Sequence, residues 1–189
     1  MPNWCYNNLD ITAKTTEQKE LLQRVADRGE DEGVFNTIRP LPEALKETVK
    51  GSGEETQEVF VDGVNNWYDW QVNNWGTKWD VNPLDEDYDG ETLSLSFDSA
   101  WAPPVALYEY LVEQGFEVSA NYYEPGMDYA GEWVDGDDFY LEGVTDLARQ
   151  NPDTLSTREY DILDMFGVFE EVAMMDEEEE MDDANDGES

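Results

Sequence analysis

Residues 92–122, TLSLSFDSAWAPPVALYEYLVEQGFEVSANY, decide the fold because they hold two strand patterns with a helix pattern between them. Apolar residues alternate with serines over 92–97, as in a half-buried strand. Pro103 and Pro104 follow, and proline suits the first turn of a helix, which Gly115 would end. Alternation resumes from Phe116 to Tyr122. The stretch therefore predicts a strand, a helix and a strand in succession.

The N-terminal part predicts a second unit of the same kind. Residues 4–12 alternate imperfectly as a strand, and Thr15 with Gln18 forms a capping box at the start of a helix. Residues 34–38 are predicted to form another short strand. Two strand–helix–strand units predict an α+β fold, a ferredoxin-like βαββαβ sandwich. A large insert at about 39–91 would separate its second and third strands.

Beyond this predicted sandwich we expect an additional hairpin and an additional helix. The hairpin spans 132–141 and turns at 135–137, whereas the aromatic stretch 122–131 is interpreted as a long loop. Ser156 and Glu159 form a capping box that opens the helix. Residues 176–189 consist mostly of like charges, which predicts a disordered acidic tail. The expected domains are 1–142, a helical extension over 143–175, and that tail.

Charge is distributed very unevenly along the chain. Its 189 residues carry a net charge of −37, and residues 51–189 hold 38 acidic against three basic side chains, which leaves −35. Such a field repels nucleic acid and anionic lipid but attracts basic proteins within a Debye length of about 8 Å. Three explanations remain open: adaptation to high salt, mimicry of DNA, and a surface loaded with Mg²⁺ or Ca²⁺.

The absence of histidine and the single cysteine, Cys5, exclude several kinds of chemistry. Neither a Ser-His-Asp nor a Cys-His nucleophile can be assembled, and an intrachain disulfide is impossible. We therefore expect a protein that is not an enzyme and needs no cofactor and no metal. The N-terminus lacks signal-peptide features, and no long apolar run occurs, so a cytoplasmic protein is expected, in the host cytoplasm if a phage encodes it.

Acidic segments are the predicted contact surface for a basic partner. A field of one sign raises the association rate with an oppositely charged surface. The segment from 85 to 90, DEDYDG, also resembles the first half of a calcium loop, but Ser96 replaces the acid that such a loop needs, so an acidic turn is favoured. The predicted binding residues are Asp85, Glu86, Asp87, Asp89, Glu91, Asp135, Asp137, Asp138, Asp176, Glu177, Glu178, Glu179 and Glu180.

Residues 65–80, NNWYDWQVNNWGTKWD, are unusually rich in aromatic and amide side chains. Indoles exposed together could stack nucleobases, with Lys78 meeting a phosphate. The other interpretation, which we favour, is that these side chains cover the open side of the sheet, since the cationic groove of a nucleic-acid site is missing. The aromatic candidates are Trp67, Trp70, Trp75 and Trp79.

Five stretches of this sequence resemble the Api-type proteins of phages and plasmids. They are MPNWCYNNL at 1–9, IRPLPEAL at 38–45, NWGTKWD at 74–80, FDSAWAPP at 97–104 and YEPGMDYAGEW at 123–133. The resemblance covers about 1–142. It implies a ferredoxin-like domain and an origin in a mobile element, and it implies no catalytic residues.

Together these features predict an acidic accessory protein that binds a basic, nucleic-acid-handling protein of host or phage, with DNA mimicry as the mechanism. Binding to a membrane is not expected, nor is direct binding to nucleic acid. The alternative is a single-stranded nucleic acid binder whose acidic tail recruits partners. A carboxylate-dependent metal enzyme is a third class, which tight binding of Mg²⁺, Mn²⁺ or Ca²⁺ would reveal.

Overall fold

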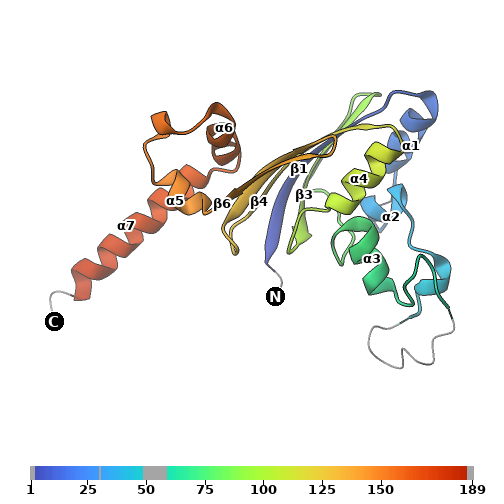
Figure 1. Ribbon diagram of the computed structural model, residues 1–189, viewed down its shortest axis with the longest axis horizontal. Helices are drawn as coiled ribbons and strands as arrows, with labels where there is room; N and C mark the ends of the chain where they lie inside the picture. Colours follow the sequence, from blue (N-terminus) through green and yellow to red (C-terminus); the bar gives the residue numbers. More distant parts are fainter. Residues whose placement is uncertain (1–2, 30, 49–58, 187–189) are drawn as a thin grey trace.

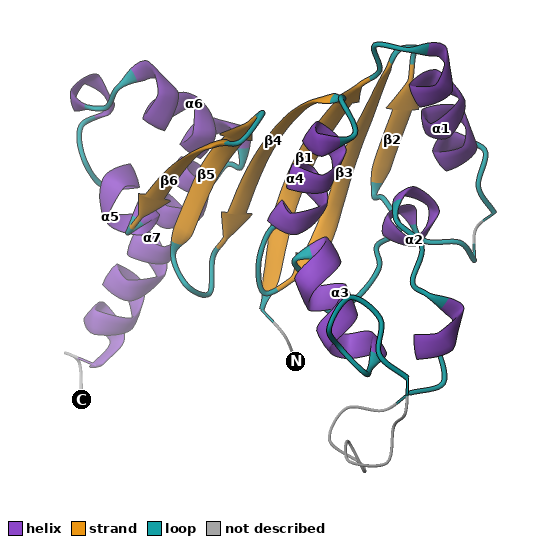
Figure 2. Cartoon of the chain, turned by 45° about the vertical axis from the view of Figure 1, so that its right-hand side comes forward, coloured by secondary structure: helices purple, strands orange, loops and turns teal. Residues whose placement is uncertain are grey.

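The computed structural model describes residues 3–29, 31–48 and 59–186 and places them in an α+β fold with one six-stranded sheet. The strand order is β2-β3-β1-β4-β5-β6, and every neighbouring pair is antiparallel. The strands are β1 Trp4–Thr12, β2 Asp85–Tyr88, β3 Thr92–Ala100, β4 Glu117–Glu124, β5 Tyr129–Val134 and β6 Asp137–Glu142. Figure 2 shows them as one twisted sheet.

Four helices cover one face of the sheet at its β1–β3 side (Figure 1). They are α1 Thr16–Ala26, α2 Val34–Ile38, α3 Trp67–Trp75 and α4 Val105–Glu113. Side chains at alternate positions of β1 and β3, such as Leu9 and Phe97, are buried against them in the main core. Alternation in sequence therefore fixed which side of each strand faces the helices, because successive strand residues point to opposite sides.

The predicted helix starts are confirmed by their caps. The Thr15 hydroxyl accepts the backbone N–H of Gln18, whose side-chain oxygen accepts the N–H of Thr15 in return. A second capping box joins Ser156 and Glu159 at the start of α6, Thr157–Met165. Two orphan N–H groups are satisfied reciprocally at each site, so the sequence signal and the local structure coincide.

Residues 34–38 form a helix, so the predicted strand there is wrong. The Asp80 carboxylate accepts the N–H groups of Phe35 and Asn36 at 2.7 and 2.9 Å and thereby holds the first turn of α2. The second strand along the chain is β2 instead, and only residues 89–91 separate it from β3. The large insert consequently lies between α1 and β2.

The predicted long loop at 122–131 is also wrong, because it is a hairpin of β4 and β5. Tyr122 pairs with Gly131, and Glu124 pairs with Tyr129, so only residues 125–128 form the turn. The hairpin predicted over 132–141 is confirmed as β5 and β6. Its turn has positive φ at Asp135 and Gly136, 48° and 104°, as a two-residue hairpin turn requires.

The C-terminal helices α5 Val144–Ala148, α6 and α7 Val168–Asp186 gather at the β5–β6 end of the sheet (Figure 1). A second core packs Tyr123 and Leu141 of the sheet against Leu163 and Val172 of α6 and α7. Residues 176–186, predicted to be disordered, continue α7. Glutamate is a good helix former, and the packed start of α7 supplies the costly nucleus. Residues 187–189 of the predicted tail lie outside the described residues.

Seven α-helices occur in the part of the chain that the structure describes. A search of those same residues finds no helix long and apolar enough to span a bilayer.

Candidate functional site

The side of β1–β4 that faces away from α1–α4 carries mostly polar side chains, and we call it the open face. Its side chains occupy every second position of the four strands and are exposed or half-buried, whereas their neighbours on β1, β3 and β4 are buried. The open face consists of Tyr6, Asn8, Asp10 and Thr12 of β1, Asp85 and Asp87 of β2, Ser94, Ser96 and Asp98 of β3, and Ser119 and Asn121 of β4.

Strand register orders the open face into rows that cross the sheet. In one row Asp87 lies opposite Ser94, which in turn lies opposite Asp10. The Ser94 hydroxyl lies 2.6 Å from the Asp10 carboxylate, and the Ser96 hydroxyl lies 2.7 Å from the Asn8 amide oxygen. The serine hydroxyls are thus turned toward acceptors of the sheet itself. Strands β1–β4, all within the described residues, contain no lysine or arginine, so this surface is acidic.

The predicted contact residues of 85–91 divide between two sides of the sheet. Asp85 and Asp87 belong to the open face, about 7 Å apart along β2. Glu86 points to the helical side, where Arg28 binds its carboxylate at 2.8 and 2.9 Å. A strand over 85–88 replaces the predicted acidic turn and sends successive carboxylates in opposite directions. The described residues contain no cluster of three metal-binding side chains.

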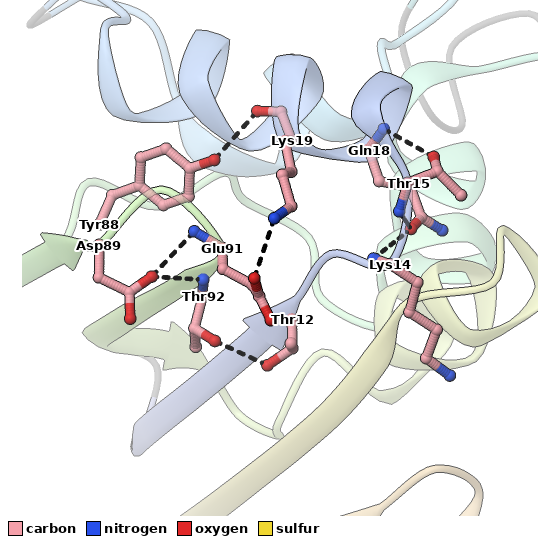
Figure 3. Close-up of polar contacts among 9 residues, drawn as sticks. All are labelled: Thr12, Lys14, Thr15, Gln18, Lys19, Tyr88, Asp89, Glu91 and Thr92. Atoms are coloured by element: carbon pink, nitrogen blue, oxygen red, sulfur yellow. Dashed lines mark hydrogen bonds and ion pairs between the residues drawn. The ribbon is translucent and has the colours of Figure 1, made fainter.

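Asp89 and Glu91 stabilise the β2–β3 turn, as Figure 3 shows. One carboxylate oxygen of Asp89 accepts the N–H groups of Glu91 and Thr92, both at 2.8 Å, and these bonds lower the pKa of Asp89. Glu91 pairs with Lys19 of α1 at 2.9 Å. Both predicted binding residues therefore have a structural task in this turn.

The three other predicted acids of the sheet lie at and beside its opposite edge. Asp135 accepts the N–H of Val118 at 2.8 Å, and Asp138 accepts the hydroxyl of Tyr122 at 2.6 Å. Burial, and then the bond to Asp138, raises the pKa of Tyr122. Asp137 is exposed at the start of β6. Since β2 and β6 are the two outer strands, the structure does not bring these acids together with those of 85–91.

The predicted acidic residues of 176–180 lie in α7. Asp176 binds Arg149 at 2.6 Å, which lowers the pKa of the aspartate, whereas Glu177 and Glu178 are exposed. Glu179 and Glu180 continue the same helix. The five predicted residues therefore lie on a helix and not on the sheet.

The four aromatic candidates do not form one platform. Trp70 and Trp75 are 2% and 1% exposed in the main core, where the ring of Trp75 contacts those of Trp70 and Phe35. Trp67 is half-buried on α3. Trp79 is exposed and lies away from this core. The interpretation that the aromatic segment helps to cover the sheet therefore holds for Trp70 and Trp75.

Trp79 instead joins two tryptophans from distant parts of the sequence. Its ring centroid lies 6.0 Å from that of Trp4, and the Lys78 ammonium lies 3.8 Å from the Trp79 ring and 3.9 Å from that of Trp101. The indoles of Trp4, Trp79 and Trp101 are 43%, 41% and 46% exposed. We call these three residues the indole cluster. Large aromatic side chains exposed together are typical of binding surfaces.

Trp101 has a left-handed backbone, which is costly for a bulky residue. Its φ is 73°, a conformation that costs about 1–3 kcal/mol. Its N–H donates to the Asn3 carbonyl at 2.9 Å, and its carbonyl accepts the Tyr129 hydroxyl at 3.0 Å. Surrounding hydrogen bonds therefore hold this indole in place. Sequence analysis missed Trp4 and Trp101, although the outward position of Trp4 in the β1 alternation was a usable signal.

A groove of about 240 Å³ lies between the indole cluster and the end of the open face. Trp4 and Trp79 line it together with Asp98 and Leu84. Asp80 also lines it, but its carboxylate is engaged with three backbone N–H groups. Asp98 has no hydrogen-bond or ion-pair partner among the described residues, and desolvation raises its pKa. The groove thus joins an indole wall to an uncompensated carboxylate.

Cys5 is buried beneath the sheet and is not a nucleophile. Burial, followed by the nearby Glu124 carboxylate, raises the pKa of its thiol to about 12. Glu124 is itself fully buried and accepts the backbone N–H groups of Gly126 and Met127 in the β4–β5 turn. The thiolate needed for covalent chemistry is therefore absent near neutral pH.

Comparison with solved structures finds a protein api92 from Yersinia pseudotuberculosis, of the DUF1281 family, with a TM-score of 0.37 and 12% sequence identity. The alignment covers 75% of this chain and 98% of that chain. No protein-family model matches this chain. No curated protein matches it either.

Proposed function

We propose that the protein is a non-enzymatic binding module whose open face engages a basic, nucleic-acid-handling protein. One observation carries the proposal: three adjacent strands, β2, β3 and β1, present Asp10, Asp85, Asp87 and Asp98 on a single accessible surface, with no basic residue in those described strands. A rigid sheet fixes the spacing of these carboxylates. A flexible acidic tail would have to be ordered on binding at an entropic cost.

Electrostatics supports a basic protein as the partner. With a net charge of −37, the chain attracts cationic surfaces and repels phosphates before contact. Steering of this kind raises association rates by about 10 to 10³ and weakens steeply with salt. A partner that normally binds nucleic acid already has the complementary groove, so occupation of that groove would block its own ligand, as a DNA mimic does.

We also propose that the fold is ferredoxin-like. Chain order β1-α1-β2-β3-α4-β4 and the spatial order β2-β3-β1-β4 support a ferredoxin-like core to which β5, β6 and the C-terminal helices are added. The five motifs quoted above support membership of the Api-type family and an origin in a phage or plasmid. In this interpretation the module is an accessory protein that acts on host or phage machinery.

The test compares two charge-matched variants on purified proteins. Immobilised DNA-binding proteins of pI above about 9 are compared with neutral proteins of equal size. The open-face variant Asp10→Asn/Asp85→Asn/Asp87→Asn should associate at least about tenfold more slowly with the basic set. The control variant Glu20→Gln/Glu109→Gln/Glu113→Gln changes the charge equally but on exposed sites of α1 and α4. Equal retention on basic and neutral proteins, or equal effects of the two variants, contradicts the proposal.

Single-stranded nucleic acid binding is the second candidate function, and the indole cluster around Lys78 is the observation that favours it. Bases stack on exposed aromatic side chains, each stack contributing about 1–3 kcal/mol. A gel-shift titration at about 150 mM salt separates the two candidates. Binding of an oligonucleotide that weakens with added salt supports this second function and counts against the first.

A further inference from the structure

The groove beside the indole cluster has the components of a site for a cation. Trp4 and Trp79 supply aromatic surface, and Asp98 supplies a carboxylate that no described residue compensates. A partly desolvated carboxylate without a partner is costly and is stabilised by an incoming positive charge. Asp98 lies opposite Tyr6, so the groove continues directly into the open face.

Lys78 of the protein itself makes cation–π contacts with this aromatic surface. Its ammonium lies 3.8 and 3.9 Å from the ring centroids of Trp79 and Trp101, well within the range of cation–π attraction. Lys78 is thereby directed to the Trp79–Trp101 side of the cluster. The groove itself is lined by Trp4, Trp79 and Asp98, and Lys78 is not among its lining residues.

The shape of the groove favours arginine over lysine or a nucleotide. A guanidinium is planar, stacks on an indole and donates two parallel hydrogen bonds to one carboxylate, whereas an ammonium is a compact, strongly hydrated point charge. The indole planes of Trp4 and Trp79 are inclined by 39°, which leaves a wedge-shaped wall for a flat group. At about 240 Å³ the groove is smaller than the 300–1,000 Å³ of ordinary ligand pockets and suits one side chain.

We propose that this groove binds an arginine side chain of the basic partner, with the guanidinium stacked on the Trp4–Trp79 wall and paired with Asp98. The inference rests on the proposed function, because it names the anchor of the partner that the open face attracts. Long-range charge on the open face sets the rate of encounter, and the groove provides the specific contact that slows dissociation.

The test uses a nine-residue peptide, GSGGRGGSG, and its lysine and citrulline counterparts. Binding is followed through the indole Nε1–H signals of the seven tryptophans in ¹⁵N-labelled protein. We expect the arginine peptide to shift the signals of Trp4 and Trp79 and to leave those of buried Trp70 and Trp75 unchanged. Citrulline keeps the shape but lacks the charge, so its peptide should bind at least about tenfold more weakly.

The isosteric variant Asp98→Asn should lower the affinity for the arginine peptide about tenfold, whereas Glu109→Gln, with the same change of charge on α4, should not. Unchanged Trp70 and Trp75 signals establish that the variant is folded. Equal binding of the citrulline peptide, stronger shifts with adenosine monophosphate, or no shift at all overturns the inference. If the peptide is silent but DNA-binding proteins are still retained through the open face, only the arginine groove is refuted. If neither binds, the proposed function falls as well.

Discussion

Replacing Asp80 by alanine should destabilise the protein by about 3 kcal/mol, because this carboxylate holds the start of α2. It accepts the N–H groups of Phe35, Asn36 and Val81 at 2.7, 2.9 and 2.8 Å. Hydrogen bonds to a charged group contribute about 1.5–3 kcal/mol each, so three give an upper bound of about 4.5–9 kcal/mol. Desolvation of the carboxylate, which raises the pKa of Asp80 and is its largest perturbation, offsets much of that sum.

Asp80→Asn separates hydrogen bonding from charge. The oxygen that accepts from Phe35 and Val81 can be kept, but the new NH₂ group faces the Asn36 donor, so we expect a loss of about 1.5 kcal/mol. Urea denaturation measures both losses as a lower midpoint at constant m-value. Asp31→Ala, an exposed site near α2, is the control and should change stability by less than about 0.5 kcal/mol.

Gly33 gives an independent check on the same contact. A Cβ at Gly33 would lie 2.1 Å from the Asp80 side chain, so Gly33→Ala should displace the carboxylate and destabilise the protein. In Asp80→Ala the obstruction is gone, and adding Gly33→Ala should then cost little. Additive losses in the double-mutant cycle, or an Asp80→Ala variant as stable as the wild type, would refute this account of α2.

Three further predictions concern the buried Cys5 thiol, the net charge of the chain and the Ser156–Glu159 helix cap. The Cys5 thiol, buried and with its pKa raised to about 12, should react with a disulfide reagent at pH 8 at least about 100-fold more slowly in folded than in urea-unfolded protein; equal rates would contradict its burial. Raising NaCl from 0.01 to 1 M shortens the Debye length from about 30 to about 3 Å, and with a net charge of −37 the melting temperature should rise; a fall would show that ion pairs outweigh repulsion. The hydrogen bond from the Ser156 N–H lowers the pKa of Glu159 below 4.5. The stability that this bond contributes is therefore complete above pH 4.5 and is lost as the pH falls through the lowered pKa. The unfolding free energies of the wild type and Glu159→Gln should converge at that low pH, and a constant difference between them would contradict the prediction.

Elements marked by local chemistry could be predicted from the sequence. The alternation in 4–12 and 92–97 identified two central strands, and the capping boxes at Thr15 and Ser156 identified two helix starts. The Asp135-Gly136 dipeptide likewise predicted the hairpin turn at 135–136. In each case neighbours within about four residues determine the structure, so the signal lies in the sequence itself.

Elements that depend on distant partners were missed or misassigned. Residues 34–38 contain the β-branched and aromatic side chains of a strand, but the Asp80 carboxylate, far along the chain, caps them as a helix. The aromatic stretch 122–131 contains the turn dipeptide Pro125-Gly126, but the residues on either side of it do not alternate clearly, and their cross-strand partners reveal the hairpin. The indole cluster combines Trp4, Trp79 and Trp101 from three distant segments, so no local sequence pattern predicts that these side chains meet. In residues 176–186 the helix propensity of glutamate and the packed start of α7 outweigh the repulsion between like charges.

The acidic groups at the two margins of the sheet have a consequence for behaviour in solution. Unpaired strand edges invite a second molecule to add its own strand, and charged side chains on those edges oppose such growth. Here β2 carries the exposed Asp85 and Asp87, and β6 carries the exposed Asp137, Asp138 and Glu142. If two copies approached each other through these edge strands, their carboxylates would repel one another. Ionised carboxylates on the edge strands should therefore oppose fibril growth. Protonation of these carboxylates at acidic pH would remove the repulsion.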